Sequence, residues 1–393
     1  MIELSERAKK LKPSTTLELA AKAKSLKDAG QDILSLTVGE PDWPTVDSAV
    51  QAGIAAIKNG VTKYTPASGT LTLRSAIAKQ FTKDYGLPCK PSEVSVASGA
   101  KYSLFAAFQI LLNNNDEVVT HSPFWVSYPE MIELCGAKSN PVFLDGIAND
   151  PKMQKAFESS FNSKTKMFLL NSPNNPSGLY LSEGDINFIG KVLKQHPNVV
   201  VVSDDIYGYL TFDRFRAPHL LDQFPELKDR TICVNGASKT FSMTGWRLGW
   251  AIGPERFIKS MADFQSQSTG CPSSIAQAAA EAAIQSMDQD LPEIKKLLIE
   301  RKQIFEDLLS KIPEVSFTSP TGAFYIWLNV GKILKQQNWD SDQFCAHLLE
   351  STGVVVVPGQ SFGQDDYIRL SFATDEKTIQ KSVSRLQKFI SEL

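Results

Sequence analysis

Short apolar runs that alternate with segments of helical period are the feature that most constrains how this chain can fold. Five of these runs have the composition of buried strands, at residues 94–97, 117–120, 166–170, 199–202 and 231–234. The alternation predicts an α/β protein with a mostly parallel sheet and helices on both of its faces. A distinctive cluster of polar or small residues follows each run at once. Ligands in such sheets bind beyond the carboxyl ends of the strands, so we expect the functional residues at that edge.

The length of the chain and the pattern of its last third predict two domains. At 393 residues, the chain exceeds one ordinary domain. A helical stretch at 292–309 leads into short strands at 323–328, 354–357 and 367–372, and a closing helix starts at 375. This pattern predicts a smaller α+β domain that the N-terminal segment completes. We assign residues 46–290 to a large α/β domain, and residues 1–45 and 291–393 to the small domain.

Composition and charge exclude several classes of protein. The 41 basic and 43 acidic side chains leave a net charge of -2 without a long block of like charge, which argues against nucleic-acid binding. The 5 cysteines lack the spacing of a zinc site or a disulfide framework, so we expect no metal and a reducing compartment. The N-terminus has no apolar core of a signal peptide, and no stretch of about 18 apolar residues occurs. We therefore expect a cytoplasmic protein that does not bind a membrane.

Lys239 lies in the most informative cluster, which spans residues 234–250 and reads VNGASKTFSMTGWRLGW. Apolar or small residues surround the lysine, and the next charged residue is Arg247 in a second apolar run. A desolvated amine close to a fixed cation has the makings of a Schiff-base lysine beside a phosphate site. Most lysines lie on the surface, but these surroundings favour the functional interpretation over that simpler one.

Two clusters combine a strand end with groups that can hold a ring or an anion. Residues 97–102 read ASGAKY and precede a helix, so their backbone N–H groups could bind an anion, although many such turns bind nothing. The cluster has neither a dinucleotide-binding nor a Walker A spacing. Trp125 lies in the cluster at 121–130, where it could stack on a pyridine ring or simply pack in the core below the loop.

Two further clusters carry amides and carboxylates. Residues 171–178 read NSPNNPSG, which could be a structural loop or a rigid loop with fixed amide donors. Asp204 and Asp205 follow a buried strand, where a carboxylate is costly unless a cation or hydrogen-bond donors meet it. Asp205 could instead face solvent or cap the loop.

Arg369 lies in an alternating strand at 367–373, far along the chain from the other candidates. The strand pattern alone slightly favours an outward-facing surface arginine. The other use of such an arginine is the planar, bidentate binding of a carboxylate.

Taken together, these motifs resemble those of the class I aminotransferases. Residues 238–250 match S-K-x-(F/Y)-x-M-T-G-W-R-x-G-(W/Y) of the aspartate aminotransferase group, the loop at 171–178 is similar to N-P-(N/H)-N-P-(S/T)-G, and residues 367–372 match Y-(I/V)-R-(L/I)-S-(F/Y). The resemblance covers essentially the whole chain and is closest to the bacterial aspartate/prephenate subgroup. It implies a fold-type I pyridoxal-phosphate enzyme with a mostly parallel seven-stranded sheet in its large domain. It also implies a homodimer whose active sites are shared between the subunits.

The resemblance implies a role for each candidate residue. Lys239 would hold pyridoxal phosphate and carry the proton, Asp204 would pair with the pyridine nitrogen, and Tyr207 would contact the ring oxygen. The remaining residues that would bind the cofactor are Gly99, Ala100, Lys101, Trp125, Asn175, Arg247 and, from the neighbouring subunit, Tyr64. The residues that would bind the substrate are Gly39, Lys101, Trp125, Asn175, Arg369, which would hold the α-carboxylate, and Lys12.

Two departures from the family pattern bear on substrate choice. Gly236 stands where other subgroups place a phosphate-binding serine, and residues 265–271 contain no arginine for a distal carboxylate. Lys101, with Lys12 as a second candidate, would supply that charge instead. We therefore expect a ping-pong Schiff-base mechanism that moves an amino group between L-aspartate, or a similar amino acid, and 2-oxoglutarate. A prephenate, aromatic or alanine aminotransferase, a lyase on the same fold, and a non-enzymatic regulator remain as alternatives.

Overall fold

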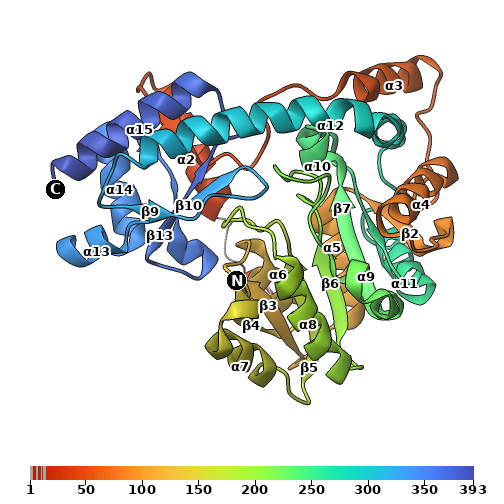
Figure 1. Ribbon diagram of the computed structural model, residues 1–393. Coiled ribbons are helices and arrows are strands. Elements are labelled where there is room, and N and C mark those ends of the chain that lie inside the picture. The colour runs from red at the N-terminus through yellow and green to blue at the C-terminus, as the bar shows by residue number, and fades with distance from the viewer. Residues whose placement is uncertain (1–2, 6–7, 10, 12–14) are drawn as a thin grey trace.

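The computed structural model describes residues 3–5, 8–9, 11 and 15–393, which form a large and a small part joined along one long helix (Figure 1). The large part is built on a seven-stranded sheet with the order β2-β8-β7-β6-β5-β3-β4. Its strands are β2 (Val94–Ala97), β3 (Glu117–Ser122), β4 (Lys138–Phe143), β5 (Thr165–Asn171), β6 (Val200–Asp204), β7 (Thr231–Gly236) and β8 (Gly249–Ile252). Only the two pairings of β8 are antiparallel. The prediction of a mostly parallel seven-stranded sheet is confirmed.

The five predicted strands are β2, β3, β5, β6 and β7, whereas β4 lacked a clear signal in the sequence. It is one of the two edge strands, and its sequence KSNPVF mixes a lysine, two polar residues and a proline with few apolar ones. An edge strand needs no continuous apolar run, because one side of it has no neighbour. Arg247 lies just before β8 rather than within it.

Helices cover both faces of the large sheet (Figure 1). Successive residues of β5 show this directly, because Met167 packs in one apolar core cluster and Phe168 in the other. The cluster around Met167 includes side chains from α5, α6 and α11, and the cluster around Phe168 includes side chains from α4, α7 and α8. The helices of this part are α3 (Asp47–Lys58), α4 (Leu71–Tyr85), α5 (Ala100–Leu111), α6 (Ser127–Leu134), α7 (Pro151–Ser159), α8 (Glu183–Gln195), α9 (Leu220–Gln223), α10 (Ala237–Thr240) and α11 (Glu255–Ser266).

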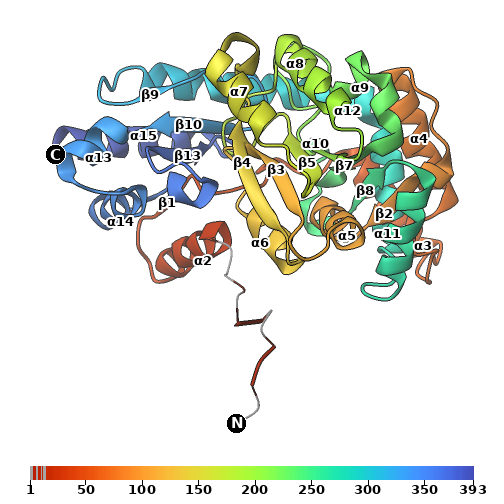
Figure 2. The same ribbon diagram turned by 90° about the horizontal axis from the view of Figure 1, so that it is seen from below.

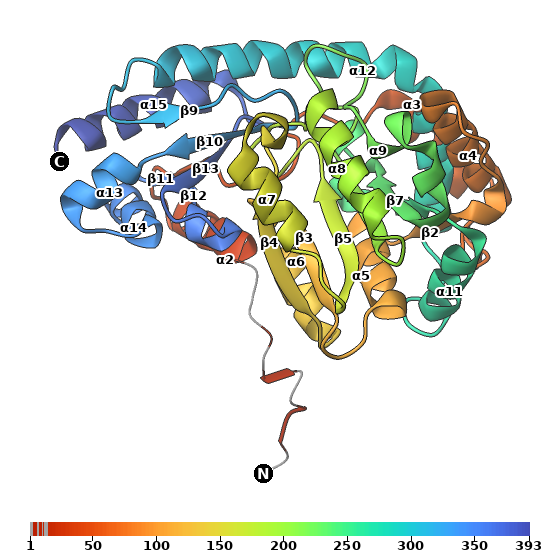
Figure 3. The same ribbon diagram turned by 60° about the horizontal axis from the view of Figure 1, so that its bottom comes forward.

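One helix, α12 (Ser274–Leu309), extends across both parts of the molecule (Figure 3). The predicted helix at 292–309 is therefore only its second half, and the expected division between residues 290 and 291 falls inside a continuous helix. Pro292 is tolerated within the helix instead of marking its first turn, which is where proline is usually found. The side chain of Ser273 caps the true start by accepting a hydrogen bond from the backbone N–H of Ala276 (3.3 Å).

The small part contains the C-terminal third of the chain and the N-terminal segment. Its antiparallel sheet has the order β12-β13-β10-β9, and β1 pairs in parallel with β11. The predicted strand at 354–357 is in fact two short strands, β11 and β12, which belong to different sheets. Figure 2 shows α2 beside β1 below this part. The elements are α2 (Thr15–Asp28), β1 (Leu34–Ser35), β9 (Ser316–Phe317), β10 (Tyr325–Asn329), α13 (Gly331–Gln337), α14 (Ser341–Thr352), β11 (Val354–Val355), β12 (Val357–Pro358), β13 (Tyr367–Ser371) and α15 (Glu376–Ser391).

The register of the large sheet gathers the polar clusters at one edge. Asn171 on β5 lies opposite Asp204 on β6, which in turn lies opposite Val234 on β7. Because these strands are parallel, the loops that follow them leave the sheet side by side. Within the described residues, no helix combines the length and the apolar character that crossing a membrane requires.

Candidate active site

A cavity of about 500 Å³ lies beyond this edge of the sheet, between the two parts of the molecule. Both parts contribute to its lining, since Lys239 comes from the large part and Arg369 and Gly39 come from the small part and the N-terminal segment. Segments far apart in the sequence thus meet in one place. The predicted site residues that line the cavity are Gly39, Ala100, Lys101, Trp125, Asn175, Asp204, Tyr207, Lys239, Arg247 and Arg369.

Lys239 lies in the short helix α10, directly after β7. Its ammonium group donates a hydrogen bond to the backbone carbonyl of Gly39. Removal of water from the ammonium lowers the pKa of Lys239 to about 8, and the positive charges of Arg369 and Arg247 act in the same direction, against the opposing charge of Glu40. More of the amine is therefore neutral near pH 7 than in an ordinary lysine, as a nucleophilic lysine requires.

Asp204 lies at the end of β6 with only 3% of its surface exposed. The hydroxyl of Tyr128 donates to its Oδ2 (2.6 Å), and the backbone N–H of Ile206 donates to its Oδ1 (3.3 Å). Burial raises the pKa of Asp204 to about 6 in spite of these donors. A buried carboxylate of this kind is stabilised by a cationic or N–H partner, and such a partner can approach from the cavity.

The loop at 171–178 is anchored to the end of β6. Asn171 donates through Nδ2 to the backbone carbonyl of Asp204 (2.8 Å) and accepts at Oδ1 from the backbone N–H of Asn175 (2.9 Å). Asn175 in turn accepts at Oδ1 from Nη1 of Arg369 (2.9 Å). The loop therefore provides both a rigid support and fixed amide groups at the cavity wall.

Two aromatic side chains complete the wall around Asp204. Trp125 lines the cavity and meets the ring of Tyr128 edge to face, with 5.4 Å between the ring centres. Tyr207 is almost completely buried, and its hydroxyl lies 2.8 Å from that of Tyr325. A flat ring that entered the cavity would thus meet an indole, a carboxylate and a phenol.

The turn before α5 forms a cradle for an anion together with Arg247. Gly99 has a φ of +96°, and a methyl group added to it would lie 2.7 Å from Nη2 of Arg247. A methyl group on Gly249 would lie 2.2 Å from the backbone nitrogen of Ala100. Glycine is therefore required at both positions. The close packing brings the guanidinium group of Arg247 to the N-terminus of α5, and both the positive charge and the helix N-terminus favour an anion.

Lys101 adds a second positive charge next to this cradle. Its ammonium group lies 4.7 Å from the centre of the Trp125 ring. Burial and the nearby charge of Arg247 lower the pKa of Lys101. Across residues 15–393, neither Lys101 nor Arg247 forms a salt bridge with a carboxylate. Both cations are therefore available to an anionic ligand.

Arg369 is buried on β13 with 2% of its surface exposed, so the interpretation as an outward-facing surface arginine is wrong. Its Nη2 donates to the backbone carbonyl of Thr37 (2.7 Å), and its Nε has no hydrogen-bond partner in the part of the chain that the structure describes. The guanidinium group lies 4.5 Å from the centre of the Tyr325 ring. A buried cation with an unpaired N–H group is suited to bind a carboxylate.

Two predicted residues lie outside the cavity lining, and a third is not among the residues that the structure describes. Gly99 sits directly behind the lining, against Arg247. Tyr64 is on the surface with 99% of its area exposed, and nothing in the single chain brings it to the cavity. Lys12 falls outside the described residues.

Sequence reasoning missed three residues that shape the cavity, namely Tyr128, Asn171 and Tyr325. Tyr128 and Asn171 lie in sequence clusters that had been identified as candidate sites. The sequence does not indicate, however, that these two residues would hydrogen-bond to Asp204. Tyr325 follows a turn that contains Gly322 in the small part, where no sequence feature pointed to the cavity.

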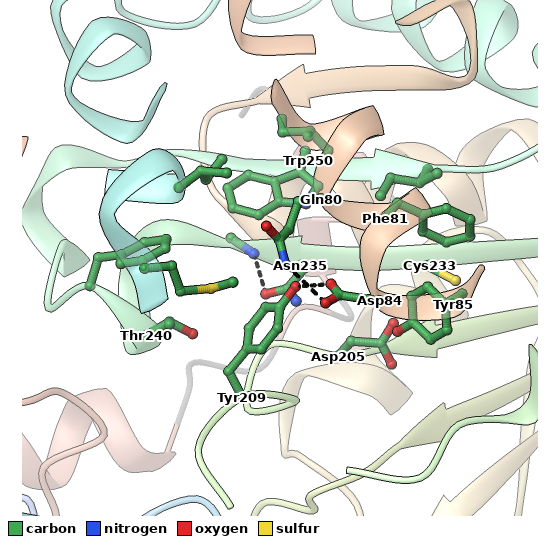
Figure 4. A pocket seen from close by; sticks show the side chains of 16 residues that line it. Gln80, Phe81, Asp84, Tyr85, Asp205, Tyr209, Cys233, Asn235, Thr240 and Trp250 are labelled. Atoms are coloured by element: carbon green, nitrogen blue, oxygen red, sulfur yellow. Dashed lines mark hydrogen bonds between the residues drawn. The ribbon is translucent and has the colours of Figure 1, made fainter. Parts of the chain in front are cut away.

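Asp205 lines a second, smaller cavity of about 40 Å³ (Figure 4). The expectation that Asp205 faces solvent or caps its loop is wrong, because it is buried and accepts a hydrogen bond from the hydroxyl of Ser203 (2.6 Å). Burial raises the pKa of Asp205 to about 8. Nε2 of His219 lies 3.6 Å from its Oδ2 and 3.9 Å from Sγ of Cys233.

The side chains of Asp205, His219 and Cys233 are spaced like metal ligands, but the position of the ring proton on His219 argues against a metal. Its Nδ1 accepts a hydrogen bond from the backbone N–H of Leu221 (3.1 Å), so the neutral ring carries its proton on Nε2. A histidine that binds a metal through Nε2 must instead carry that proton on Nδ1. The cluster is therefore a buried hydrogen-bond network, in which Nε2 of His219 also lies 3.1 Å from the hydroxyl of Ser203.

The residues around the larger cavity fit the cofactor that the sequence implies. The cradle at Gly99 and Arg247 suits a phosphate, the buried carboxylate of Asp204 suits a protonated ring nitrogen, and the amine of Lys239 suits an aldehyde carbon. The donors and acceptors thus have the chemical types that pyridoxal phosphate requires.

Comparison with known proteins relates the chain over its whole length to aminotransferases. Residues 31–386 match the family described as aminotransferase class I and II. The chain is 38% identical to an aspartate aminotransferase from Bacillus subtilis, with 100% of both chains covered. It is also 38% identical to an aspartate/prephenate aminotransferase from Nitrosomonas europaea, with 99% of this chain and 100% of the relative covered. Its structure is similar to that of the aspartate aminotransferase from Thermus thermophilus with maleate, with a TM-score of 0.91, 34% identity, and 99% of this chain and 100% of that one covered.

Proposed function

The chain belongs to the family of class I and II aminotransferases, and we propose that it moves an amino group between L-aspartate and 2-oxoglutarate. It is a transferase that uses pyridoxal phosphate, as members of this family do. The observation that carries the proposal is that Arg369 and Lys101, two cations without carboxylate partners among the described residues, line the same cavity as the amine of Lys239. A dicarboxylate amino acid needs one cation for each of its carboxylates.

Pyridoxal phosphate, when bound, supplies an electron sink for the charge that develops on the α-carbon of the substrate. Lys239 would attach the cofactor and, once released as a free amine, move the proton between the substrate Cα and the cofactor carbon C4′. Asp204 would keep the proton on the ring nitrogen, because a buried carboxylate gains most from a cationic partner. Each role requires the side chain to face the cavity, and the lining residues support this.

The other cavity residues would hold the cofactor in place. Trp125 would stack on the ring, and Asn175 and Tyr207 would donate hydrogen bonds to the ring oxygen. The phosphate would bind in the cradle that is formed by Arg247 and the start of α5, through the backbone of Gly99, Ala100 and Lys101. The positive charge of Arg247, which forms no salt bridge within residues 15–393, supports this arrangement.

For the substrate, we propose that Arg369 binds the α-carboxylate, with Asn175 and the backbone of Gly39 beside it. Lys101 would bind the distal carboxylate, with Lys12 as a second source of charge. Support comes from the Thermus thermophilus structure, whose maleate is a four-carbon dicarboxylate. The name of the relative from Nitrosomonas europaea favours prephenate as a second candidate substrate. Prephenate also carries two carboxylates, which could bind to the same two cations.

We further propose a cytoplasmic homodimer with shared active sites. Tyr64 is fully exposed in the single chain, and the exposed apolar residues Ile54, Ile57, Val61 and Leu71 are near it in the sequence. A partner subunit that buried these residues could bring Tyr64 to the phosphate cradle of the other site. All 5 cysteines are free, which fits a reducing compartment.

A panel of amino donors and acceptors tests the proposal. Purified enzyme with pyridoxal phosphate would be assayed with aspartate, glutamate, alanine and phenylalanine as donors, against 2-oxoglutarate, oxaloacetate and prephenate. We expect the highest kcat/KM for aspartate with 2-oxoglutarate, and measurable activity with prephenate. A preference for alanine or phenylalanine over both acidic donors would reject the assignment of aspartate.

A further inference from the structure

Tyr325 touches both ends of the active site, although none of the recognised motifs includes it. It lies on β10 of the small part, is completely buried at 0% exposure, and lines the active-site cavity. Its hydroxyl lies 2.8 Å from that of Tyr207, and the centre of its ring lies 4.5 Å from the guanidinium carbon of Arg369. A methyl group added to Gly39 would lie 3.4 Å from the same hydroxyl. One side chain thus contacts the residues assigned to the cofactor and to the substrate carboxylate.

The two hydroxyls share a single hydrogen bond, and its direction has a consequence for the cofactor. Within residues 15–393, each of the two phenol oxygens has the other as its one hydrogen-bond partner. A phenol has one proton to donate and can also accept. If Tyr207 donates its proton to the ring oxygen of the cofactor, its own oxygen must accept from Tyr325.

We propose that Tyr325 is a positioning residue that directs the Tyr207 proton to the cofactor and supports the guanidinium plane of Arg369. The proposal rests on the proposed function, because it takes the roles of Tyr207 and Arg369 from there. The hydroxyl of Tyr325 serves the first task, and the face of its ring serves the second. The two tasks can be separated by substitution.

The surroundings of the pair support this arrangement. Burial raises the pKa of both phenols, so each keeps its proton, and the charged groups that act on them are Arg369 and Asp204. A hydroxyl that accepts a hydrogen bond becomes a better donor, so a bond from Tyr325 strengthens the one that Tyr207 gives to the ring oxygen. The flat guanidinium group of Arg369 gains a favourable contact with the electron-rich face of the Tyr325 ring.

The first test measures how the visible absorption of the bound cofactor changes with pH. Tyr325→Phe keeps the ring and removes only the hydroxyl, so the negatively charged ring oxygen loses part of its stabilisation. We expect the pKa of the absorption change to rise by roughly 0.4 to 1 pH unit, in the same direction as for Tyr207→Phe. Because the effect acts through Tyr207, it should vanish when Tyr325→Phe is introduced into the Tyr207→Phe protein.

The second test measures the binding of maleate to the enzyme with its cofactor. Tyr325→Phe should leave the Kd for maleate within about 2-fold, whereas Tyr325→Leu, which removes the ring face beside Arg369, should raise it by roughly 3- to 10-fold. Tyr325→Leu also lacks the hydroxyl, so it provides the same pH titration if the phenylalanine variant does not fold. Tyr367→Phe is the matched control, because its ring stacks on Trp327 outside the cavity lining. It should change neither the titration nor the Kd.

The outcomes separate this inference from the proposed function. Additive pKa shifts for the two single variants, or an unchanged titration in both Tyr325 variants, would overturn the role of the hydroxyl. Equal Kd values for maleate in the Phe and Leu variants would overturn the role of the ring. If the wild-type protein gave no cofactor absorption at all, the proposed function itself would fail.

Discussion

Substitution of Gly99 by alanine tests the phosphate cradle with a single methyl group. Gly99 precedes α5 with a φ of +96° and a ψ of 156°, a combination that is almost restricted to glycine. The strain of an alanine there should cost about 1–3 kcal/mol of unfolding free energy. The added methyl group would also lie 2.7 Å from Nη2 of Arg247, so the guanidinium group must move.

The movement of Arg247 sets the expected effect on the cofactor. A hydrogen bond to a charged group contributes about 1.5–3 kcal/mol, so loss of one phosphate contact should raise the Kd for pyridoxal phosphate by roughly 10- to 150-fold. At saturating cofactor, kcat should fall by less than about 3-fold, because Lys239 and Asp204 lie on other elements. Absorbance titration of cofactor-free protein gives the Kd, and thermal unfolding of the same protein gives the loss of stability.

Gly245→Ala is the matched control for this experiment. Gly245 lines the same cavity, but a methyl group there would meet nothing within 4 Å and its backbone does not have the positive φ of Gly99. Its Kd for pyridoxal phosphate should stay within about 3-fold of the wild-type value. If Gly99→Ala lost stability but bound pyridoxal phosphate as tightly as the control, Arg247 would not be a phosphate ligand.

Three further substitutions test the other assignments. Lys239→Ala should fold but lose turnover by several orders of magnitude, and activity near the wild-type value would contradict its role. Because the pKa of Lys239 is lowered to about 8, cofactor-free wild-type protein should incorporate pyridoxal phosphate faster as the pH rises from 7 towards 8. Asp204→Asn should lower kcat more than cofactor affinity, and the reverse order would mean that its role is misassigned. Lys101→Ser should lower kcat/KM for aspartate and glutamate by roughly 10- to 100-fold and leave alanine nearly unaffected, whereas an equal loss for all donors would assign Lys101 to the phosphate or the fold.

The sequence was sufficient to predict the central sheet but not the joint between the two parts. Buried parallel strands such as β5 and β6 are apolar on both faces, so they stand out as continuous runs. The edge strand β4 gives no such signal. Helix α12 was predicted too short, because the position of Pro292 within it depends on packing rather than on local preference.

The sequence likewise predicted some residues of the candidate site and not others. Residues such as Lys239 and Asn175 lie in motifs that the sequence displays as contiguous letters. The residues that support them are fixed by tertiary contacts, as when Tyr128 on α6 reaches Asp204 on β6. A tyrosine at the start of a helix has the same appearance in the sequence whether it supports a carboxylate or fills the core.

The burial of Arg369 shows why the difference between sequence motifs and tertiary contacts matters for function. In the sequence it alternates with apolar residues in a way that also fits a surface strand, yet it lies completely inside the protein and is held by Asn175 and the carbonyl of Thr37. Asn175 belongs to the large part, whereas Thr37 belongs to the N-terminal segment that packs with the small part. A substrate carboxylate on Arg369 would therefore bridge both parts, so the position of the substrate relative to Lys239 depends on how α12 and the N-terminal segment join them.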